Sequence, residues 1–303
     1  MSDFSRLLCE NNVEFYKDVL LSEISSFKIG GAAAYLVYPD TKEKLMFAVN
    51  AAKSLGIKYT VVGNSSNILF SDKGYSGMVL VSRKLSKISF EEKQGDDVLI
   101  CGAGASLPAV SKAVAERGFC GFEFACGIPG SIGGAVYMNA GAHGGQISDI
   151  LVSSKAYDTE QNRVFEICRA DHDFSYRHSK YMTQNSLICL EAIFSVTKGD
   201  KRETVEKMKE YNLRRRSSQP LSIPSAGSYF KRPEGYIAAK LIDECGLKGY
   251  RIGGAAVSDL HAGFIVNLGG ATSCDVLSLE EYVRDKVYCE TGVTLEREVR
   301  FIE

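Results

Sequence analysis

The stretch GIPGSIGGAVYMNAGAHGG, residues 127–145, decides how the rest of this chain is interpreted. Glycine loses much conformational entropy on folding, so a dense group of glycines marks a place where the backbone must approach a ligand or another segment closely. Pro129 and Gly130 predict a turn, and Gly133 and Gly134 would let the backbone lie flat against a ligand. A pair of ordinary connecting loops is the alternative for this stretch.

A second stretch of small residues, VVGNSSNILF, lies upstream at residues 61–70. A β-rich run ends on Gly63, and the asparagines and serines after it would supply amide and hydroxyl donors. Successive backbone N–H groups in such a turn can form a concave site for an anion. The alternative is an ordinary turn capped by Asn and Ser side chains. Two such segments, each starting from a strand-rich unit, predict a long ligand held between two subdomains.

The common nucleotide-binding motifs do not fit. GAGASL, residues 102–107, follows a predicted strand and precedes a predicted helix, but Leu107 stands where GxGxxG needs its third glycine for close helix–strand packing. No GxxxxGK[ST] motif occurs. The chain therefore has a nucleotide site of another kind, or none.

Composition excludes several broad classes. The 303 residues are 45% apolar, which is enough for two or three packed units. A net charge of −1 does not favour binding to nucleic acid or to an anionic membrane. No window approaches 18 consecutive apolar residues, and the N-terminus lacks a basic region followed by an apolar core. We expect a soluble, cytoplasmic protein that is a monomer or a weak oligomer.

The nine cysteines include no CxxC pair, and the four histidines form no HExxH motif. This spacing predicts no metal site. Free, buried thiols in a reducing cytosol are the expected state of the cysteines.

The pattern of apolar residues predicts an α+β protein of three units. A helix is expected over residues 41–55, with Thr41 as its N-cap and Gly56 as its C-cap. Apolar and polar residues alternate over residues 293–303, which predicts a C-terminal strand with Val293, Leu295, Val299 and Phe301 on one face. The expected domains are residues 1–82 with 292–303, then 83–200, and finally 201–291 with its connecting helix.

Longer motifs now become recognisable. With SSFKIGGAA (residues 25–33), the two small-residue stretches resemble the FAD-binding domain of vanillyl-alcohol-oxidase-like, PCMH-type flavoproteins, over about residues 25–198. The whole chain from about Leu21 resembles the UDP-N-acetylenolpyruvoylglucosamine reductase family, in the shorter branch that lacks an extra tyrosine-bearing loop. The motifs that carry this resemblance are FSYRHSKYM (174–182), SAGSYFKRPEGYIAAKLI (225–242), GLKGYRIGGAAVSDLHAGFIVN (246–267) and LEREVRFI (295–302). It implies a two-subdomain FAD-binding domain and a C-terminal α+β substrate-binding domain.

The resemblance also implies an activity: NADPH-dependent reduction of the enolpyruvyl ether of UDP-N-acetylglucosamine enolpyruvate, in peptidoglycan precursor synthesis. Ser228 would give a proton to the α-carbon. Arg177 would hold the carboxylate and the developing enolate, and Glu298 would be the third catalytic residue, with Glu296 as its local competitor. A serine without a His-Asp pair makes sense here, because a carbanion-like partner is a strong base and a weak acid suffices when it is well placed.

The resemblance assigns FAD, held non-covalently, to the two small-residue stretches. Candidate FAD contacts are Gly63, Asn64, Ser65, Ser66, Asn67, Pro129, Gly130, Ile132, Gly133, Gly134, Asn139, Gly141 and Arg300. Substrate contacts would be Tyr176, Lys231, Arg232, Arg214 and His261, although His261 could equally be a packed histidine. Many members carry lysine where this chain has Ser218, so the anchor of the substrate diphosphate stays open, with the run Arg214–Arg216 as an alternative.

Two other functions stay open at this point. One is a flavin oxidase or dehydrogenase of the same cofactor fold that acts on an alcohol. The other is a flavin- or UDP-sugar-binding sensor without catalysis.

Overall fold

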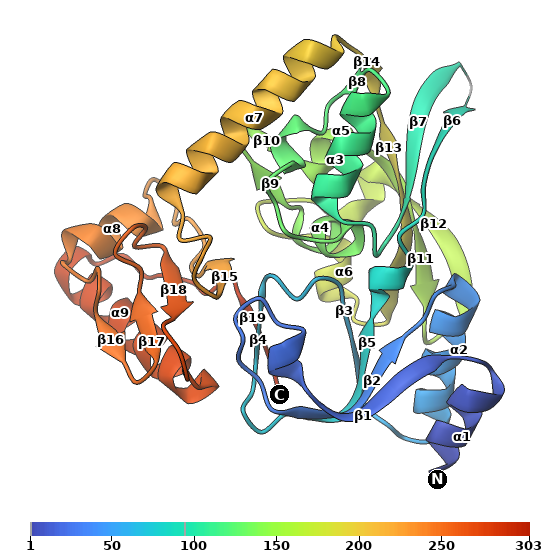
Figure 1. The fold of residues 1–303 in the computed structure, drawn as a ribbon, viewed down its shortest axis with the longest axis horizontal. Helices are drawn as coiled ribbons and strands as arrows, with labels where there is room; N and C mark the ends of the chain where they lie inside the picture. The colour runs from blue at the N-terminus through green and yellow to red at the C-terminus, as the bar shows by residue number, and fades with distance from the viewer. Residues whose placement is uncertain (1, 94) are drawn as a thin grey trace. The chain divides into compact units, whose positions relative to one another are not determined.

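The computed structural model describes residues 2–93 and 95–303, and Figure 1 shows their helices and strands along the chain. The chain forms two compact units, each assembled from segments far apart in the sequence. The first comprises Met1–Tyr16, Tyr35–Asn64 and Gly77–Arg214, and the second comprises Lys17–Ala34, Ser65–Ser76 and Arg215–Glu303. The predicted three-domain division stays a prediction.

The first unit contains a five-stranded antiparallel sheet with the strand order β12-β11-β13-β7-β6. Its side chains alternate between the two faces of the sheet. Ala192 and Phe194 of β13 join a buried cluster with Leu107 and Val110 of α3, so Ile193 points to the other face. The strands and helices of this region are β6 (Ile88–Lys93), β7 (Asp96–Gly102), α3 (Leu107–Glu116), α4 (Ile132–Met138), β11 (Leu151–Asp158), β12 (Arg163–Cys168) and β13 (Leu187–Ser195).

The N-terminal part of the chain contributes a four-stranded sheet with the order β1-β2-β5-β3. Helix α2 buries Leu45, Ala48 and Val49 in a cluster that also holds Met78 and Leu80 of β5. The elements here are α1 (Asp3–Glu10), β1 (Glu14–Leu20), β2 (Ala32–Tyr38), α2 (Lys42–Ser54), β3 (Tyr59–Val62) and β5 (Tyr75–Val81).

The second unit is built on a four-stranded sheet with the order β15-β18-β17-β16. Helix α9 buries Val276, Leu279, Val283 and Val287, four residues of one helix face, in the core of this unit. The elements are β4 (Ile68–Phe70), β15 (Ser225–Ser228), α8 (Ala238–Glu244), β16 (Arg251–Ile252), β17 (Ala255–Val257), β18 (Phe264–Asn267), α9 (Ser273–Thr291) and β19 (Arg300–Ile302).

Short elements and one long helix complete the described chain. Helix α7 (Lys201–Ser218) is the predicted polar connecting helix, and only Thr204 on it is buried. The short elements are 3-10 helices at Leu21–Glu23, Ser82–Lys84, Glu123–Ala125 and Arg169–His172, short strands at Phe119–Cys120 (β8), Gly141–Ala142 (β9), Gly145–Gln146 (β10) and Thr197–Lys198 (β14), and single-turn helices at Ile147–Ile150 (α5) and Lys180–Thr183 (α6).

The predicted C-terminal strand over residues 293–303 is wrong in length, because only β19 forms a ladder, parallel to β4. The predicted apolar face is nevertheless correct, since Val293, Leu295, Val299 and Phe301 all pack in or against the core of the second unit.

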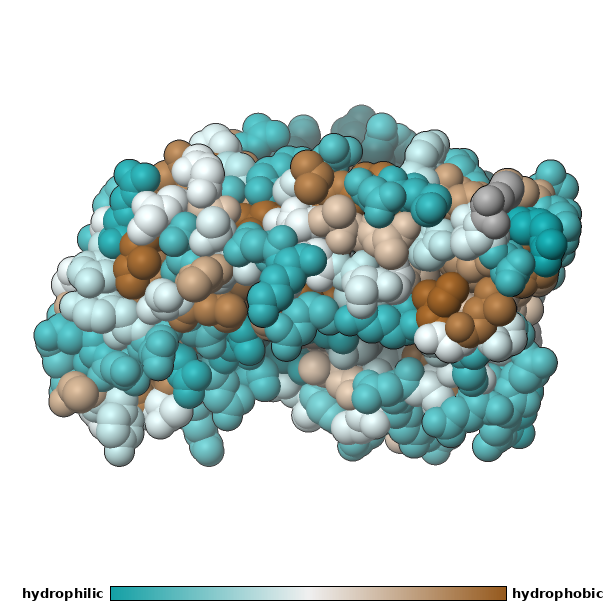
Figure 2. Space-filling view, turned by 90° about the horizontal axis from the view of Figure 1, so that it is seen from below, coloured by the Kyte–Doolittle hydropathy of each residue, from teal (hydrophilic) through white to brown (hydrophobic). Residues whose placement is uncertain are grey.

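All nine cysteines are free thiols, as expected, but the expectation that they are buried is confirmed only for Cys101 and Cys126. Cys9, Cys168, Cys274 and Cys289 are exposed. No helix among residues 2–93 and 95–303 combines the length and apolar composition needed to cross a membrane. Figure 2 shows one face of the molecule, on which hydrophobic residues form separate groups among hydrophilic ones.

Candidate active site

Ser228 is placed by a bulge in strand β15. Ser225 pairs with Val266 and Ser228 pairs with Phe264. Between these two pairs, β15 therefore contains one more residue than β18. Gly227 has φ of +81°, a left-handed conformation that glycine adopts readily. A bulge of this kind turns the following side chain and ends regular pairing. Ser228 is exposed, whereas the next residue, Tyr229, is buried.

The segment of Glu298 pairs through backbone with the residues that follow Ser228. The amide of Glu298 donates a hydrogen bond of 2.8 Å to the carbonyl of Tyr229, and Phe230 forms a β-bridge with Arg297. In this register Glu298 lies opposite Tyr229, the residue that follows Ser228 in the chain. Two of the three predicted catalytic residues therefore come from neighbouring segments of the second unit.

The contacts of Lys231 distinguish the two candidate glutamates. The Lys231 amide donates to the Glu296 carbonyl at 2.8 Å, and Lys231 Nζ forms an ion pair of 3.1 Å with Glu296 Oε2. Glu296 is therefore the ion-pair partner of a predicted substrate-binding lysine, and the choice of Glu298 over Glu296 as the catalytic residue stays a prediction. Arg232, the next predicted substrate contact, is exposed.

His261 supports the turn next to Ser228. Its Nδ1 accepts a hydrogen bond of 3.1 Å from the amide of Gly263, whose carbonyl accepts the Tyr229 amide at 2.8 Å. The ring also contacts Phe264 edge-on, with centroids 4.9 Å apart. Burial lowers the pKa of His261 below its ordinary value. These contacts match the alternative of a packed histidine, and its predicted role in substrate binding stays a prediction.

Arg177, the third predicted catalytic residue, lies in the first unit on a tight turn. Its φ of +55° is unusual for a side chain with a Cβ atom. Nη2 donates to the carbonyl of Gly141 at 3.3 Å, and the guanidinium carbon lies 5.0 Å from the ring centroid of Tyr176, which is half-exposed. The turn thus holds a planar cation beside an aromatic ring, and the planar donors of a guanidinium match the geometry of a carboxylate.

Asn139 connects this turn to helix α4. Its side chain is buried, its Nδ2 donates to the Ser175 carbonyl at 3.0 Å, and its Oδ1 accepts the Ser148 amide at 2.9 Å. Asn139 has φ of +42° and caps α4 at its C-terminus. The observed bonds of Asn139 therefore join α4 to α5 and to the loop that carries Arg177, and its predicted contact with FAD stays a prediction.

The two small-residue stretches meet at Gly63 and Ser131 in the first unit. A Cβ atom at Gly63 would lie 1.9 Å from Ser131 Oγ, so only glycine fits there. Asn64 Nδ2 donates to the Pro129 carbonyl at 3.2 Å. Ser131 caps helix α4, which contains the predicted contacts Ile132, Gly133 and Gly134, and Gly130 completes the turn before it.

The predicted contacts that follow Asn64 belong to the second unit. Asn67 Nδ2 donates to the Glu298 carbonyl at 3.3 Å, and the Arg300 amide donates to the Asn67 carbonyl at 3.0 Å. Ser65 is buried, and its hydroxyl has no hydrogen-bond partner among the described residues. Ser66 is half-buried beside it. A buried hydroxyl of this kind fits a segment that binds a polar group such as a diphosphate.

Arg83 was not predicted from the sequence as a residue of this region. Arg83 donates from Nη2 to the Asn64 carbonyl at 3.1 Å, which brings a cation to the first small-residue loop. It follows β5 in a short helical turn, and nothing in its local pattern separates it from an ordinary surface arginine. Arg214, a predicted substrate contact on α7, forms an exposed ion pair of 2.5 Å with Glu210.

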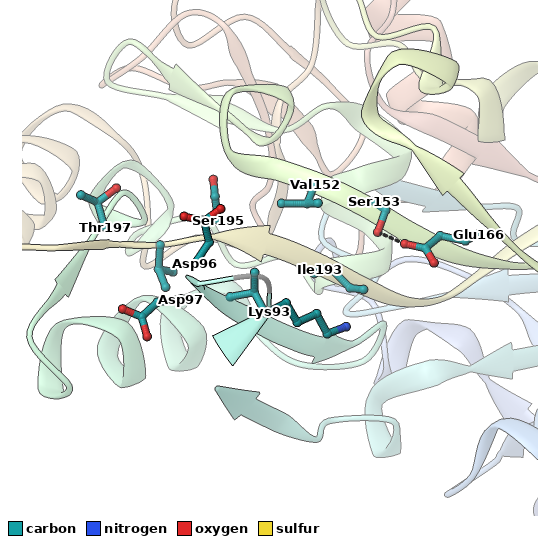
Figure 3. A pocket seen from close by; sticks show the side chains of 11 residues that line it. Lys93, Asp96, Asp97, Val152, Ser153, Glu166, Ile193, Ser195 and Thr197 are labelled. Atoms are coloured by element: carbon teal, nitrogen blue, oxygen red, sulfur yellow. Dashed lines mark hydrogen bonds between the residues drawn. The ribbon is translucent and has the colours of Figure 1, made fainter. Parts of the chain in front are cut away.

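A pocket elsewhere in the first unit contains none of the predicted site residues. Figure 3 shows that it lies on the five-stranded sheet, with Ser153 Oγ donating to Glu166 at 2.5 Å. Val98 and Ile193 place it on the sheet face opposite α3. Its polar lining residues are Lys93, Asp96, Asp97, Ser153, Glu166, Ser195 and Thr197.

Comparison with known proteins identifies the family. Residues 219–302 match the C-terminal domain of UDP-N-acetylenolpyruvoylglucosamine reductase, and residues 33–166 match an FAD binding domain. UDP-N-acetylenolpyruvoylglucosamine reductase from Caldicellulosiruptor bescii is 44% identical over 302 residues, covering 99% of this chain and 94% of that protein. The chain belongs to the UDP-N-acetylenolpyruvoylglucosamine reductase family.

Other members of this reductase family are similar to the chain over almost its whole length. The reductase from Clostridium beijerinckii is 43% identical over 297 residues, covering 98% of this chain and 95% of that protein. The crystal structure of the reductase from Thermus caldophilus has a TM-score of 0.80 at 32% identity, covering 96% of this chain and 99% of that one. The α+β fold with a PCMH-type FAD-binding domain is confirmed, and the chain is an FAD-binding oxidoreductase of peptidoglycan precursor synthesis.

Proposed function

We propose that this reductase uses NADPH to reduce the enolpyruvyl ether of UDP-N-acetylglucosamine enolpyruvate, which yields UDP-N-acetylmuramate. Family membership supports the substrate class. The observation that carries the mechanistic part is the exposed Ser228 after a bulge, followed at once by residues that pair through backbone with the segment of Glu298.

FAD, bound non-covalently at residues 63–67 and 129–134, would supply the hydride for the terminal carbon of the enol ether. Negative charge then develops on the α-carbon and spreads into the adjacent carboxylate. The Arg177 guanidinium, held by Gly141, would stabilise this enolate with a planar pair of donors.

Ser228 would complete the reaction by donating its hydroxyl proton to the α-carbon. A serine is a weak acid, but an enolate carbon is a strong base, so geometry rather than acidity decides the rate. Glu298 would hold the same hydrogen-bond network in place. Tyr176, Lys231 and Arg232 would contact the substrate, with Lys231 already oriented by Glu296.

The test begins with the purified protein, which should be yellow and should release FAD on acid precipitation. NADPH oxidation should require the enol ether, and initial rates should follow a ping-pong pattern, because both substrates would react with the same flavin in turn. Oxygen consumption with alcohols in place of the enol ether would favour the oxidase alternative. Bound FAD without NADPH oxidation would favour the sensor.

A further inference from the structure

A carboxylate is buried beneath the segments of Ser228 and Glu298. Glu280 lies on α9 at the same helix face as Val276, Leu279 and Val283, where an apolar residue is expected. It is 5% exposed. Burying an ionised carboxylate is costly unless hydrogen bonds and opposite charges compensate for the lost hydration, so its partners indicate what it is retained for.

The partners of Glu280 are the chain neighbours of the two candidate catalytic residues. Glu280 Oε2 accepts a hydrogen bond of 2.8 Å from the hydroxyl of Tyr229, which is 1% exposed. The same oxygen lies 3.5 Å from Nη1 of Arg297, and Arg284 Nη1 lies 3.9 Å from Oε1. Tyr229 follows Ser228 in the chain, and Arg297 precedes Glu298.

Through these contacts, Glu280 on α9 holds the segment of Tyr229 and the segment of Arg297 together. The backbones of residues 229–231 and 296–298 pair through two hydrogen bonds, both of 2.8 Å, with Phe230 opposite Arg297. A single carboxylate oxygen then joins the side chains of Tyr229 and Arg297, one from each segment. Because Tyr229 is bonded to Ser228 in the chain and Arg297 to Glu298, holding these two side chains restrains the backbone that carries both candidate catalytic residues.

We propose that Glu280 is a positioning residue for the Ser228–Glu298 pair and that it acts through Tyr229 and Arg297. This inference rests on the proposed function. It assigns Glu280 no contact with substrate or cofactor. Its effect should appear in the proton-donating half of the reaction and not in flavin reduction.

The experiment uses the FAD-loaded protein with Tyr229→Phe and Glu280→Gln, and with Glu281→Gln as the matched control on the exposed side of α9. Rapid mixing with NADPH measures flavin reduction, and mixing the reduced protein with the enol ether measures its reoxidation. We expect Tyr229→Phe and Glu280→Gln to reduce the flavin within about twofold of the wild-type rate and to slow reoxidation by about tenfold or more. Glu281→Gln should change neither rate.

Two further readouts separate positioning from a loss of stability. Reoxidation by Tyr229→Phe should show a larger solvent deuterium isotope effect than wild type, because the proton transfer becomes slower. The double variant should be no slower than the slower single variant, since both changes break one network. Tyr229→Phe keeps the buried ring, so it carries the test if Glu280→Gln does not fold.

Folded variants with wild-type reoxidation rates, or variants in which both half-reactions slow equally, would overturn the inference. A wild-type protein that cannot reduce the enol ether would instead overturn the proposed function, and the inference with it.

Discussion

Asn139 Nδ2 donates a hydrogen bond of 3.0 Å to the backbone carbonyl of Ser175, two residues before Arg177. This bond joins the end of helix α4 to the turn whose strained residue is the predicted carboxylate ligand. The small-residue stretch from which the sequence analysis began therefore extends to the Arg177 turn through Asn139, whose side chain is buried.

Asn139→Gly removes the side-chain hydrogen bond to Ser175 and should leave the Arg177 turn less well fixed. It should not strain α4, because glycine readily adopts the left-handed conformation that Asn139 has. We expect flavin content to stay near that of wild type and kcat/KM for the enol ether to fall by up to about 100-fold. Steady-state kinetics measures this. Asn50→Asp is the matched control, since its carboxamide bonds Asn162 and Tyr157 elsewhere in the first unit. Equal losses in both variants would contradict the assignment.

Gly227→Ala tests the bulge before Ser228. Nothing lies within 4 Å of a Cβ atom at this position, so the cost is conformational and should lower the free energy of unfolding by about 1–2 kcal/mol. The turned serine should also move, which slows reoxidation by the enol ether. Gly292→Ala has the same open surroundings and a positive φ, and should lose stability alone. Denaturant unfolding and rapid mixing compare the two.

Glu298→Gln and Glu296→Gln form a matched pair two residues apart. We expect Glu298→Gln to lower kcat by about 10²–10³, because a carboxamide does not reproduce the hydrogen bonds through which the carboxylate would hold the network at Ser228. Glu296→Gln breaks only a partly exposed ion pair with Lys231, so its effect should be confined to KM for the enol ether. Steady-state assays on both variants decide this, and the reverse order of effects would assign the role to Glu296.

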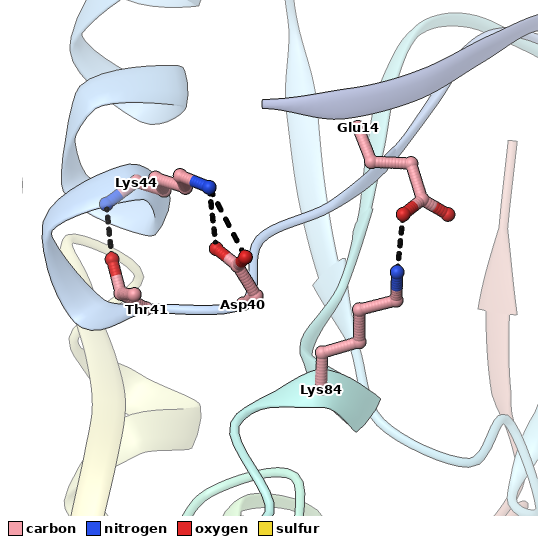
Figure 4. Close-up of polar contacts among 5 residues, drawn as sticks. All are labelled: Glu14, Asp40, Thr41, Lys44 and Lys84. Atoms are coloured by element: carbon pink, nitrogen blue, oxygen red, sulfur yellow. Dashed lines mark hydrogen bonds and ion pairs between the residues drawn. The ribbon is translucent and has the colours of Figure 1, made fainter. Parts of the chain in front are cut away.

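Several elements were predictable because local chemistry decides them. Thr41 caps helix α2 as predicted by accepting a hydrogen bond from the Lys44 amide, which Figure 4 shows beside the ion pair of Lys44 with Asp40. The Lys44 ammonium also lowers the pKa of Asp40. Helix α3, expected after residues 102–107, begins in the same way after Ser106, whose side chain accepts a hydrogen bond from the Ala109 amide. In both helices the capping residue and the amide that it bonds lie within four residues of each other in the sequence, so the start of the helix can be predicted locally.

Helix α4 was missed because tertiary packing overrides its local propensity. Gly133 and Gly134 each weaken a helix by about 1 kcal/mol relative to alanine, which favours a loop. The folded chain needs Gly133, since a Cβ atom there would lie 2.9 Å from that of Ala103. The bulge at Gly227 and the pairing of Tyr229 with Glu298 depend on segments about 70 residues apart, and no periodicity in either segment indicates them.

His172 predicts a pH dependence of stability. Burial lowers its pKa to about 4, and its Nε2 bonds Ser154 Oγ at 3.1 Å, whose hydroxyl also bonds Tyr181 at 2.7 Å. The unfolded chain binds this proton near pH 6.5, so the stabilisation is complete above that pH and is lost as pH falls towards 4, up to about 3 kcal/mol. Denaturant unfolding between pH 7.5 and 4.5 should show a steeper loss for wild type than for His172→Gln. Parallel curves would refute this role.

The central claim is that Ser228 donates the proton that completes the reduction. The most direct measurement is rapid mixing of Ser228→Ala, first with NADPH and then, once the flavin is reduced, with the enol ether. We predict flavin reduction at the wild-type rate and reoxidation slowed by about 10²–10⁴. Reoxidation at the wild-type rate would contradict the account.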